Sequence, residues 1–201
     1  MKKLYVVGNK VSKSLSPTIF NYWFKKYNIK ARYGYLELTE KNFHNKIKDV
    51  LEKKDTLGLN VTIPFKNKII KHLGKIDAHA KKIGAVNCVT NKKTINGTNT
   101  DWTGYYKTLP NIKQTKNRKV IILGYGGASH AIHYVLKKRG FKDILIFNRS
   151  KKKIKYSKNT EYTKKYSDLE THLEGVFLII NTTPINPMSV SYTHLRAHET
   201  S

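Results

Sequence analysis

The feature that most constrains the fold is a glycine-rich loop between an apolar run and a helical pattern. Residues 119–123 have the composition of a buried strand, Gly124-Tyr125-Gly126-Gly127-Ala128 follows, and helical spacing continues to about Arg139-Gly140. Glycines here let the backbone approach a pyrophosphate, and the helix N-terminus favours its negative charge. A tight turn without a ligand is the alternative, but the strand–loop–helix context favours a nucleotide site.

Strand and helix patterns alternate along the rest of the chain. The predicted strands cover 4–7, 32–38, 58–63, 86–90, 94–98, 119–123, 143–147 and 176–180. Ser16 and Pro17 predict an N-cap and a first helical residue, and Thr39 is predicted to cap a helix with an apolar stripe. Further helices are predicted at about 65–73 and 101–109.

This alternation predicts an α/β protein with a mainly parallel sheet that is covered on both faces. The pattern stops at Pro110, passes through a polar run at 111–118, and then restarts. We therefore predict a substrate domain at 1–110 and a Rossmann-type nucleotide domain at 111–189. Residues 190–201 break the pattern and are predicted to be a non-native tail, with a short helical tail as the alternative.

The formal net charge of +26 raises the question of a nucleic-acid partner, because lysine and arginine release counterions from phosphate backbones. The lysines, however, are spread along the whole chain and are enriched together with asparagine, isoleucine and tyrosine, as in A/T-rich genomes. We therefore expect solvated lysine faces that speed the arrival of anionic ligands, and no nucleic-acid partner.

Other features exclude further classes of protein. No run reaches membrane-span length and the apolar run after Met1 is too short for a signal peptide, so a cytoplasmic protein without membrane contact is expected. The single cysteine, Cys88, excludes a disulfide framework. His130 and His133 share a helix face, but no acidic or thiol side chain is placed to join them, so no metal site is expected.

The residues after the 143–147 strand indicate which dinucleotide is bound. An NAD site usually has an acidic residue here, which holds the ribose hydroxyls. This chain has Asn148-Arg149-Ser150 followed by three lysines, which would attract a 2′-phosphate instead. NADP is therefore the predicted cofactor. A basic surface turn is the alternative, and it fits Lys151 and Lys152 better than Arg149, because arginine is rare in this chain.

Lys66 and Asp101 are the candidate reactive groups. Lys66 follows a strand end and Pro64, in the first turn of the predicted 65–73 helix, where the helix dipole disfavours a protonated amine. Partial burial would lower the pKa of this lysine further, whereas a nearby Asp101 would raise it. Such a lysine can exchange protons with a substrate, and next to a dinucleotide this suits oxidation of a secondary alcohol. Taken singly, the two would be a surface lysine and a helix cap.

Seven short motifs occur in the order and spacing of shikimate dehydrogenases, and the chain resembles this family from Met1 to about Ser189. The motifs are Ser14-x-Ser16-Pro17, Asn60-Val61-Thr62-x-Pro64-x-Lys66, Gly84-Ala85-Val86-Asn87, Asn99-Thr100-Asp101, Gly124-x-Gly126-Gly127-Ala128, Asn148-Arg149-Ser150 and Asn181-Thr182-Thr183.

The resemblance implies reversible reduction of 3-dehydroshikimate to shikimate with NADPH, in the chorismate pathway to aromatic amino acids, by a monomer or homodimer. Lys66, paired with Asp101, is the implied acid/base group. The implied substrate ligands are Ser14 and Ser16 for the carboxylate, and Asn60, Thr62, Asn87 and Asp101 for the ring hydroxyls. The implied cofactor ligands are Gly124, Gly126, Gly127, Ala128 and Ser129 for the pyrophosphate, Asn148, Arg149, Ser150 and Lys153 for the 2′-phosphate, and Thr182 and Thr183 near the nicotinamide half.

The chain departs from the family pattern in several places. Trp102 stands where glycine is common, Tyr125 where alanine is commoner, and Cys88 where threonine is frequent. The family continues past the Asn181 motif with further strands and with helices that carry a substrate-binding glutamine. We therefore expect an exposed sheet edge, reduced stability and weak or no activity. The alternatives are a quinate/shikimate dehydrogenase that uses NAD and a non-catalytic nucleotide-binding fragment.

Overall fold

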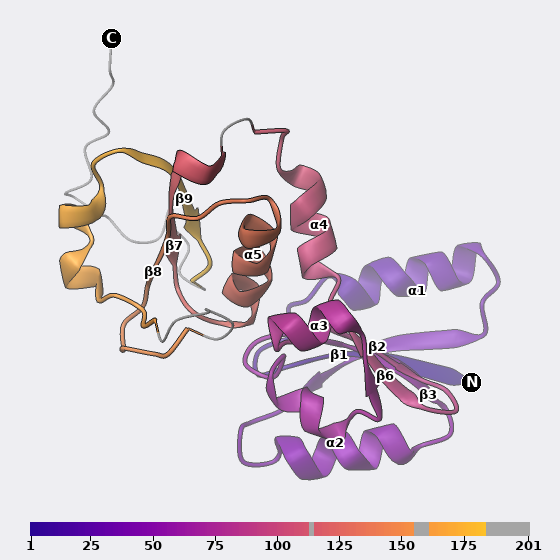
Figure 1. The fold of residues 1–201 in the computed structure, drawn as a ribbon. Helices are drawn as coiled ribbons and strands as arrows, with labels where there is room; N and C mark the ends of the chain where they lie inside the picture. Colours follow the sequence, from indigo (N-terminus) through magenta and orange to yellow (C-terminus); the bar gives the residue numbers. More distant parts are fainter. Residues whose placement is uncertain (113–114, 155–160, 184–201) are drawn as a thin grey trace.

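The computed structural model, which describes residues 1–112, 115–154 and 161–183, contains two α/β units, each built around its own sheet (Figure 1). The tail predicted for 190–201 lies outside the described residues. The first unit comprises β1 (Lys2–Gly8), α1 (Ser16–Lys26), β2 (Ala31–Glu37), α2 (Phe43–Glu52), β3 (Thr56–Val61), η1 (Lys68–His72), β4 (Lys75–Ile76), α3 (Ala78–Ile83), β5 (Cys88–Asn91) and β6 (Ile95–Thr98). The chain continues with α4 (Asp101–Thr108), η2 (Thr115–Asn117), β7 (Lys119–Leu123), α5 (Gly127–Lys138), β8 (Ile144–Phe147), η3 (Tyr166–Asp168), η4 (Glu170–His172) and β9 (Val176–Asn181).

The sheet of the first unit has the strand order β2-β1-β3-β5-β6-β4. The pairs β1–β2, β1–β3 and β4–β6 are parallel, whereas β3–β5 and β5–β6 are antiparallel. The predicted hairpin between the segments at 86–90 and 94–98 is confirmed as the β5–β6 pair, and it gives the sheet its antiparallel part. Helices α1 and α2 lie on opposite sides of this sheet (Figure 1).

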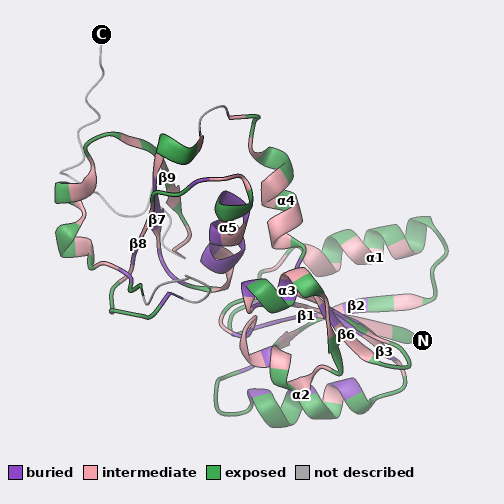
Figure 2. Ribbon diagram, viewed as in Figure 1, coloured by how far each residue is buried: buried purple, intermediate pink, exposed green. Residues whose placement is uncertain are grey.

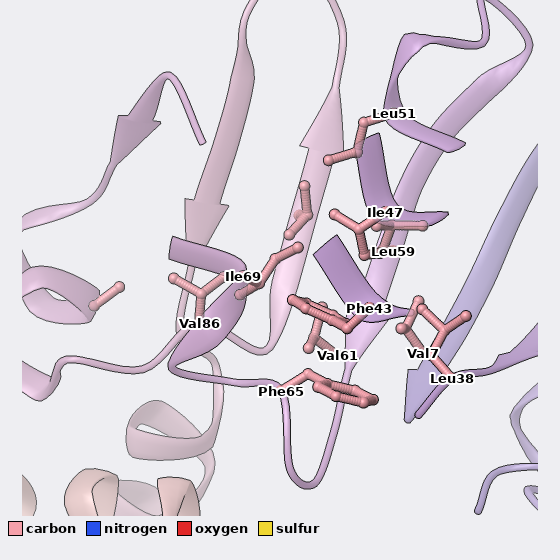
Figure 3. Packing of buried hydrophobic residues seen from close by; sticks show 12 residues of the cluster. Val7, Leu38, Phe43, Ile47, Leu51, Leu59, Val61, Phe65, Ile69 and Val86 are labelled. Carbon is pink, nitrogen blue, oxygen red and sulfur yellow. The ribbon is translucent and has the colours of Figure 1, made fainter. Parts of the chain in front are cut away.

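The main core of the first unit lies between α2 and the sheet. Phe43, Ile47 and Leu51 recur every four residues along α2, so all three side chains face the sheet and are buried. Phe43 stacks on Phe65 with ring centroids 4.2 Å apart and planes 10° apart (Figure 3). Since Phe65 directly precedes Lys66, this stack anchors the turn that carries the predicted acid/base lysine.

Two predicted helix caps are wrong, by one residue at α1 and by three residues at α2. Ser16 is the first residue of α1, Leu15 occupies the N-cap position without a side-chain cap, and the Ser14 hydroxyl accepts from the Ser16 amide at 3.2 Å. Asn42, and not Thr39, is the N-cap of α2. Thr39 and Asn42 instead bond each other's backbone amides in the turn before the helix. Cap position depends on backbone dihedral angles, which the residue type only biases.

The second unit has a three-stranded parallel sheet in the order β8-β7-β9. Strand β7 lies in the middle and is almost fully buried, and α5 is the helix with the most buried residues (Figure 2). The predicted strand–glycine loop–helix unit is therefore confirmed. Among the described strands β9 is an edge, and its Phe177 and Ile179 side chains are 40% and 48% exposed.

Helices α3, α4 and α5 join the two units. His79 of α3 stacks on Trp102 of α4 with centroids 4.3 Å apart, and its Nδ1 lies 2.7 Å from the Tyr134 hydroxyl of α5. Farther along, the Arg139 guanidinium lies 3.9 Å from the centroid of the Tyr106 ring and donates to the Tyr106 carbonyl. Trp102, which departs from the family pattern, thus fills the joint between the units.

The buried His133 of α5 makes the stability of the protein depend on pH. Burial, reinforced by Lys137, lowers the pKa of His133 to about 4 from an ordinary value of 6.5. Between these two values the unfolded chain binds a proton that the folded chain does not. The free energy of unfolding is therefore fully retained above about pH 6.5 and falls as the pH drops toward 4.

We expect the His133→Gln variant to lose this part of the acid sensitivity. The difference corresponds to roughly 3 kcal/mol between pH 6.5 and pH 4. Denaturant unfolding of the wild type and the variant at several pH values measures it. Identical pH profiles for the two proteins would contradict the assignment.

Candidate active site

The predicted pair of Lys66 and Asp101 is present in the structure. Lys66 Nζ lies 2.6 Å from Asp101 Oδ2, and the two side chains are 13% and 31% exposed. A largely buried ammonium that contacts a carboxylate can hold or release a proton at the oxygen of a bound ligand.

Lys66 does not sit in a helix, so this part of the prediction is wrong. The chain turns after β3, and only Lys68–His72 form a short 3₁₀ helix, η1. The carbonyl of Lys66 accepts from the amide of Val86, which leads into β5, so its hydrogen bond crosses to another segment. The backbone of Lys66 is therefore held by the segment that leads into β5, and the helix dipole predicted to act on its amine is not present at this residue.

Asp101 is placed by two asparagines. It is the first residue of α4, and the buried Asn99 side chain accepts from the Asp101 and Trp102 amides while donating to the Ala85 carbonyl. Asn87 Nδ2 donates to Asp101 Oδ1 at 2.7 Å. One carboxylate oxygen is thus engaged by Asn87 and the other by Lys66, and the N-terminus of α4 favours the negative charge.

The other predicted substrate ligands lie at the same end of the first sheet. Thr62 follows β3, with its amide bonded to the Val7 carbonyl, and Ser14 precedes α1. Asn60 in β3 accepts a 2.7 Å hydrogen bond from the Tyr33 hydroxyl. Ser14 and Ser16 meet only through the Ser14 hydroxyl and the Ser16 amide. No hydrogen bond within the described ranges joins these four side chains to Lys66 or Asp101.

The glycine loop of the second unit lies directly against the lysine of the first. A Cβ at Gly127 would come 3.0 Å from Lys66 Cδ and 3.1 Å from Lys66 Cβ, so the lysine stem rests on this glycine. A Cβ at Gly126 would meet nothing within 4 Å, which leaves open space at the N-terminus of α5. This space, faced by backbone amides, fits a pyrophosphate.

The remaining loop residues are packed into the second unit. Gly124 has φ +96°, and a Cβ there would lie 2.8 Å from the Thr182 hydroxyl. Thr182 follows β9 and bonds the Leu123 carbonyl through both its amide and its hydroxyl, so this threonine and the glycine loop lie side by side. Ser129 is fully buried, and its hydroxyl has no partner among the described residues. Ala128 is half-buried in the first turn of α5.

The predicted 2′-phosphate residues follow β8, as expected. Asn148 Nδ2 donates to the Ser150 carbonyl at 2.9 Å, which shapes the turn, and Arg149 and Lys153 are exposed. No acidic residue stands at positions 148–153. Thr183 instead forms a local turn, because its amide and hydroxyl both donate to Asn181 Oδ1.

Three contributing residues were missed by the sequence reasoning. Asn99, two residues before Asp101, had a detectable signal, because asparagine is favoured as a helix cap. Tyr33 and Trp102 had none, since their roles arise from contacts across the fold. Within the described part of the chain, no helix is long and apolar enough to cross a membrane, and no three metal-ligating side chains cluster.

Comparison with known families agrees with this geometry. Residues 6–89 match the shikimate dehydrogenase substrate binding domain, and residues 107–198 match the shikimate/quinate 5-dehydrogenase family. A shikimate dehydrogenase (NADP(+)) of Clostridium botulinum is 38% identical over 185 residues, which cover 90% of this chain and 70% of the relative.

The chain belongs to the shikimate dehydrogenase family.

Solved structures of the family have the same fold. Shikimate dehydrogenase 1 of Peptoclostridium difficile superposes with a TM-score of 0.79 at 30% identity, covering 93% of this chain and 70% of that one. A Thermus thermophilus shikimate 5-dehydrogenase in complex with NADP(H) and shikimate superposes with a TM-score of 0.63 at 26% identity, covering 75% and 57%. The α/β fold with a Rossmann-type second unit is thereby confirmed.

The contact between Gly127 and Lys66 leads to a prediction. A methyl group in the Gly127→Ala variant would push the Lys66 stem away and disturb its 2.6 Å contact with Asp101. We expect the Gly127→Ala variant to oxidise shikimate with NADP more slowly than the wild type, with little change in thermal stability. Gly104→Ala in α4, where a Cβ meets nothing within 4 Å, is the control. Equal turnover in both variants and the wild type would show that the contact is unimportant.

Proposed function

We propose that this chain catalyses the NADP-dependent, reversible reduction of 3-dehydroshikimate to shikimate. The observation that carries the proposal is the ion pair of Lys66 and Asp101, which is half-buried and lies against the glycine loop of the nucleotide-binding unit. A proton-transfer group beside a dinucleotide loop is what alcohol oxidation requires. Family membership supplies the substrate, because the relatives are named for it.

In the proposed mechanism Lys66 moves the proton. Bound NADPH supplies the hydride for the reduction. Lys66 Nζ donates a proton to the substrate oxygen that becomes the hydroxyl group, and in the reverse direction it removes this proton. Asp101 keeps the lysine in place and offsets its charge, and Asn87 fixes the Asp101 carboxylate through its other oxygen.

Four of the other predicted ligands keep their proposed roles: Ser14 and Ser16 would bind the substrate carboxylate, and Asn60 and Thr62 would bind ring hydroxyls. Asn87, predicted in the same role, already donates to Thr100 and Asp101 and accepts from the Thr100 amide, so we assign it the bracing of Asp101. Open space at Gly126 and the lack of acid after β8 fit NADP. The cytoplasmic location, the monomeric or homodimeric state and the domain limits at 110 and 189 stay predictions.

Substitution of the lysine tests the proposal. We expect Lys66→Ala to lower shikimate oxidation, followed through NADPH absorbance, by about 100-fold or more, because general acid–base catalysis is lost. Calorimetry should still detect shikimate binding. Lys68→Ala is the matched control, since Lys68 is paired with Glu40 on the surface. Unchanged turnover in Lys66→Ala would remove this lysine from the mechanism.

Substitution of Arg149 tests the cofactor assignment. We expect Arg149→Ala to weaken NADP binding by about tenfold while NAD binding changes little, because a charge-assisted contact to the 2′-phosphate is lost. Arg32→Ala, at an exposed position of β2, controls for the loss of one positive charge. Equal effects on the two cofactors, or better turnover of quinate with NAD, would favour the quinate/shikimate alternative.

A further inference from the structure

Tyr33 is a buried tyrosine that lies outside the predicted set of site residues, on the edge strand β2. Only 2% of it is exposed, and its ring stacks on Phe20 of α1 with centroids 4.6 Å apart and planes 7° apart. Asn21 of α1 accepts from the Tyr33 amide and donates to the Tyr33 carbonyl, both at 2.8 Å. Helix α1 therefore holds both the ring and the backbone of Tyr33 in place.

The Tyr33 hydroxyl is aimed at a predicted substrate ligand. It donates to Asn60 Oδ1 at 2.7 Å, and burial raises the pKa of the Tyr33 phenol, so the hydroxyl keeps its proton. No other hydrogen bond of this hydroxyl occurs among the described residues, so an Asn60 NH₂ group turned toward it would leave the buried O–H proton without an acceptor. An amide group is planar, and with its oxygen engaged the Asn60 NH₂ group faces away from the phenol. Within the described segments no hydrogen bond occupies this NH₂ group, which leaves it available to a ligand.

Asn60 lies where a ligand is expected. In the sheet it is paired with Val6 of β1 and Cys88 of β5, close to the carboxyl end of β3, and the chain passes from there through Thr62 to Lys66. Ligands of α/β proteins bind at the carboxyl ends of parallel strands. Asn60 is half-buried, so its amide is partly open to solvent.

We infer that Tyr33 is a positioning residue that determines specificity: its hydroxyl fixes the Asn60 amide so that the NH₂ group, and not the oxygen, is presented to the substrate. Without this contact the amide can rotate by half a turn and offer an acceptor instead of a donor. A fixed donor selects a hydroxyl or keto oxygen of the ring. The inference rests on the proposed function, which makes this ring that of shikimate or 3-dehydroshikimate.

Removal of the hydroxyl alone tests the inference. Tyr33→Phe keeps the stack on Phe20 and removes only the hydrogen bond. We expect shikimate binding, measured by calorimetry, to weaken by about fivefold to tenfold while NADP binding is unchanged. The KM for shikimate should rise and kcat should stay nearly constant, because the contact serves the bound substrate and the transition state alike.

A double-mutant cycle shows whether Tyr33 acts through Asn60. In the Asn60→Ala background, Tyr33→Phe should have no further effect on shikimate binding. Tyr5→Phe is the matched control, because Tyr5 lies on the adjacent strand β1 and packs on the α2 side of the sheet, with the core that contains Val7. Additive effects of Tyr33→Phe and Asn60→Ala would overturn the inference.

The outcomes separate this inference from the proposed function. A wild-type protein that does not bind shikimate overturns both. If the wild type binds shikimate and Tyr33→Phe binds it with the same affinity, the inference alone is overturned. A Tyr33→Phe variant that loses NADP binding and melts at lower temperature, in parallel with its loss of shikimate binding, shows a merely structural role and also overturns it.

Discussion

The contact between Lys66 Nζ and Asp101 Oδ2 is the interaction on which the site depends. Taking two charges partly out of water has a free-energy cost, and their attraction offsets this cost only with good geometry and further hydrogen bonds. Asn87 and the start of α4 supply that support on the carboxylate side. Such a pair adds little to stability, which is consistent with the proposed role in proton transfer.

The ion pair also lies at the joint between the two units. The Lys66 stem rests on Gly127 of the glycine loop, and Asp101 begins the helix whose next residue, Trp102, packs between His79 and Tyr134. Any change in the angle between the units would therefore move the lysine relative to the loop. The same packing that joins the two sheets holds Lys66, the proposed proton-transfer group, beside the glycine loop.

Long, regular segments of this fold were predictable from the sequence. The stripe of Phe43, Ile47 and Leu51 and the apolar run at 119–123 lie where periodicity placed them. Short elements were not predictable: β4 has two residues and α3 has six, which is too few for a periodic pattern. The supposed helix around Lys66 was wrong because the Lys66 carbonyl is bonded to the remote amide of Val86.

The sequence by itself determined the residue types at the site, the glycine loop, the absence of an acid after β8 and the family. Only the tertiary structure decided which side chains meet: Lys66 with Asp101, Asn87 with Asp101, and Tyr33 with Asn60. The reason is physical. Local sequence encodes backbone preference and burial, whereas contacts between distant residues depend on strand register and on the direction in which each side chain leaves the backbone.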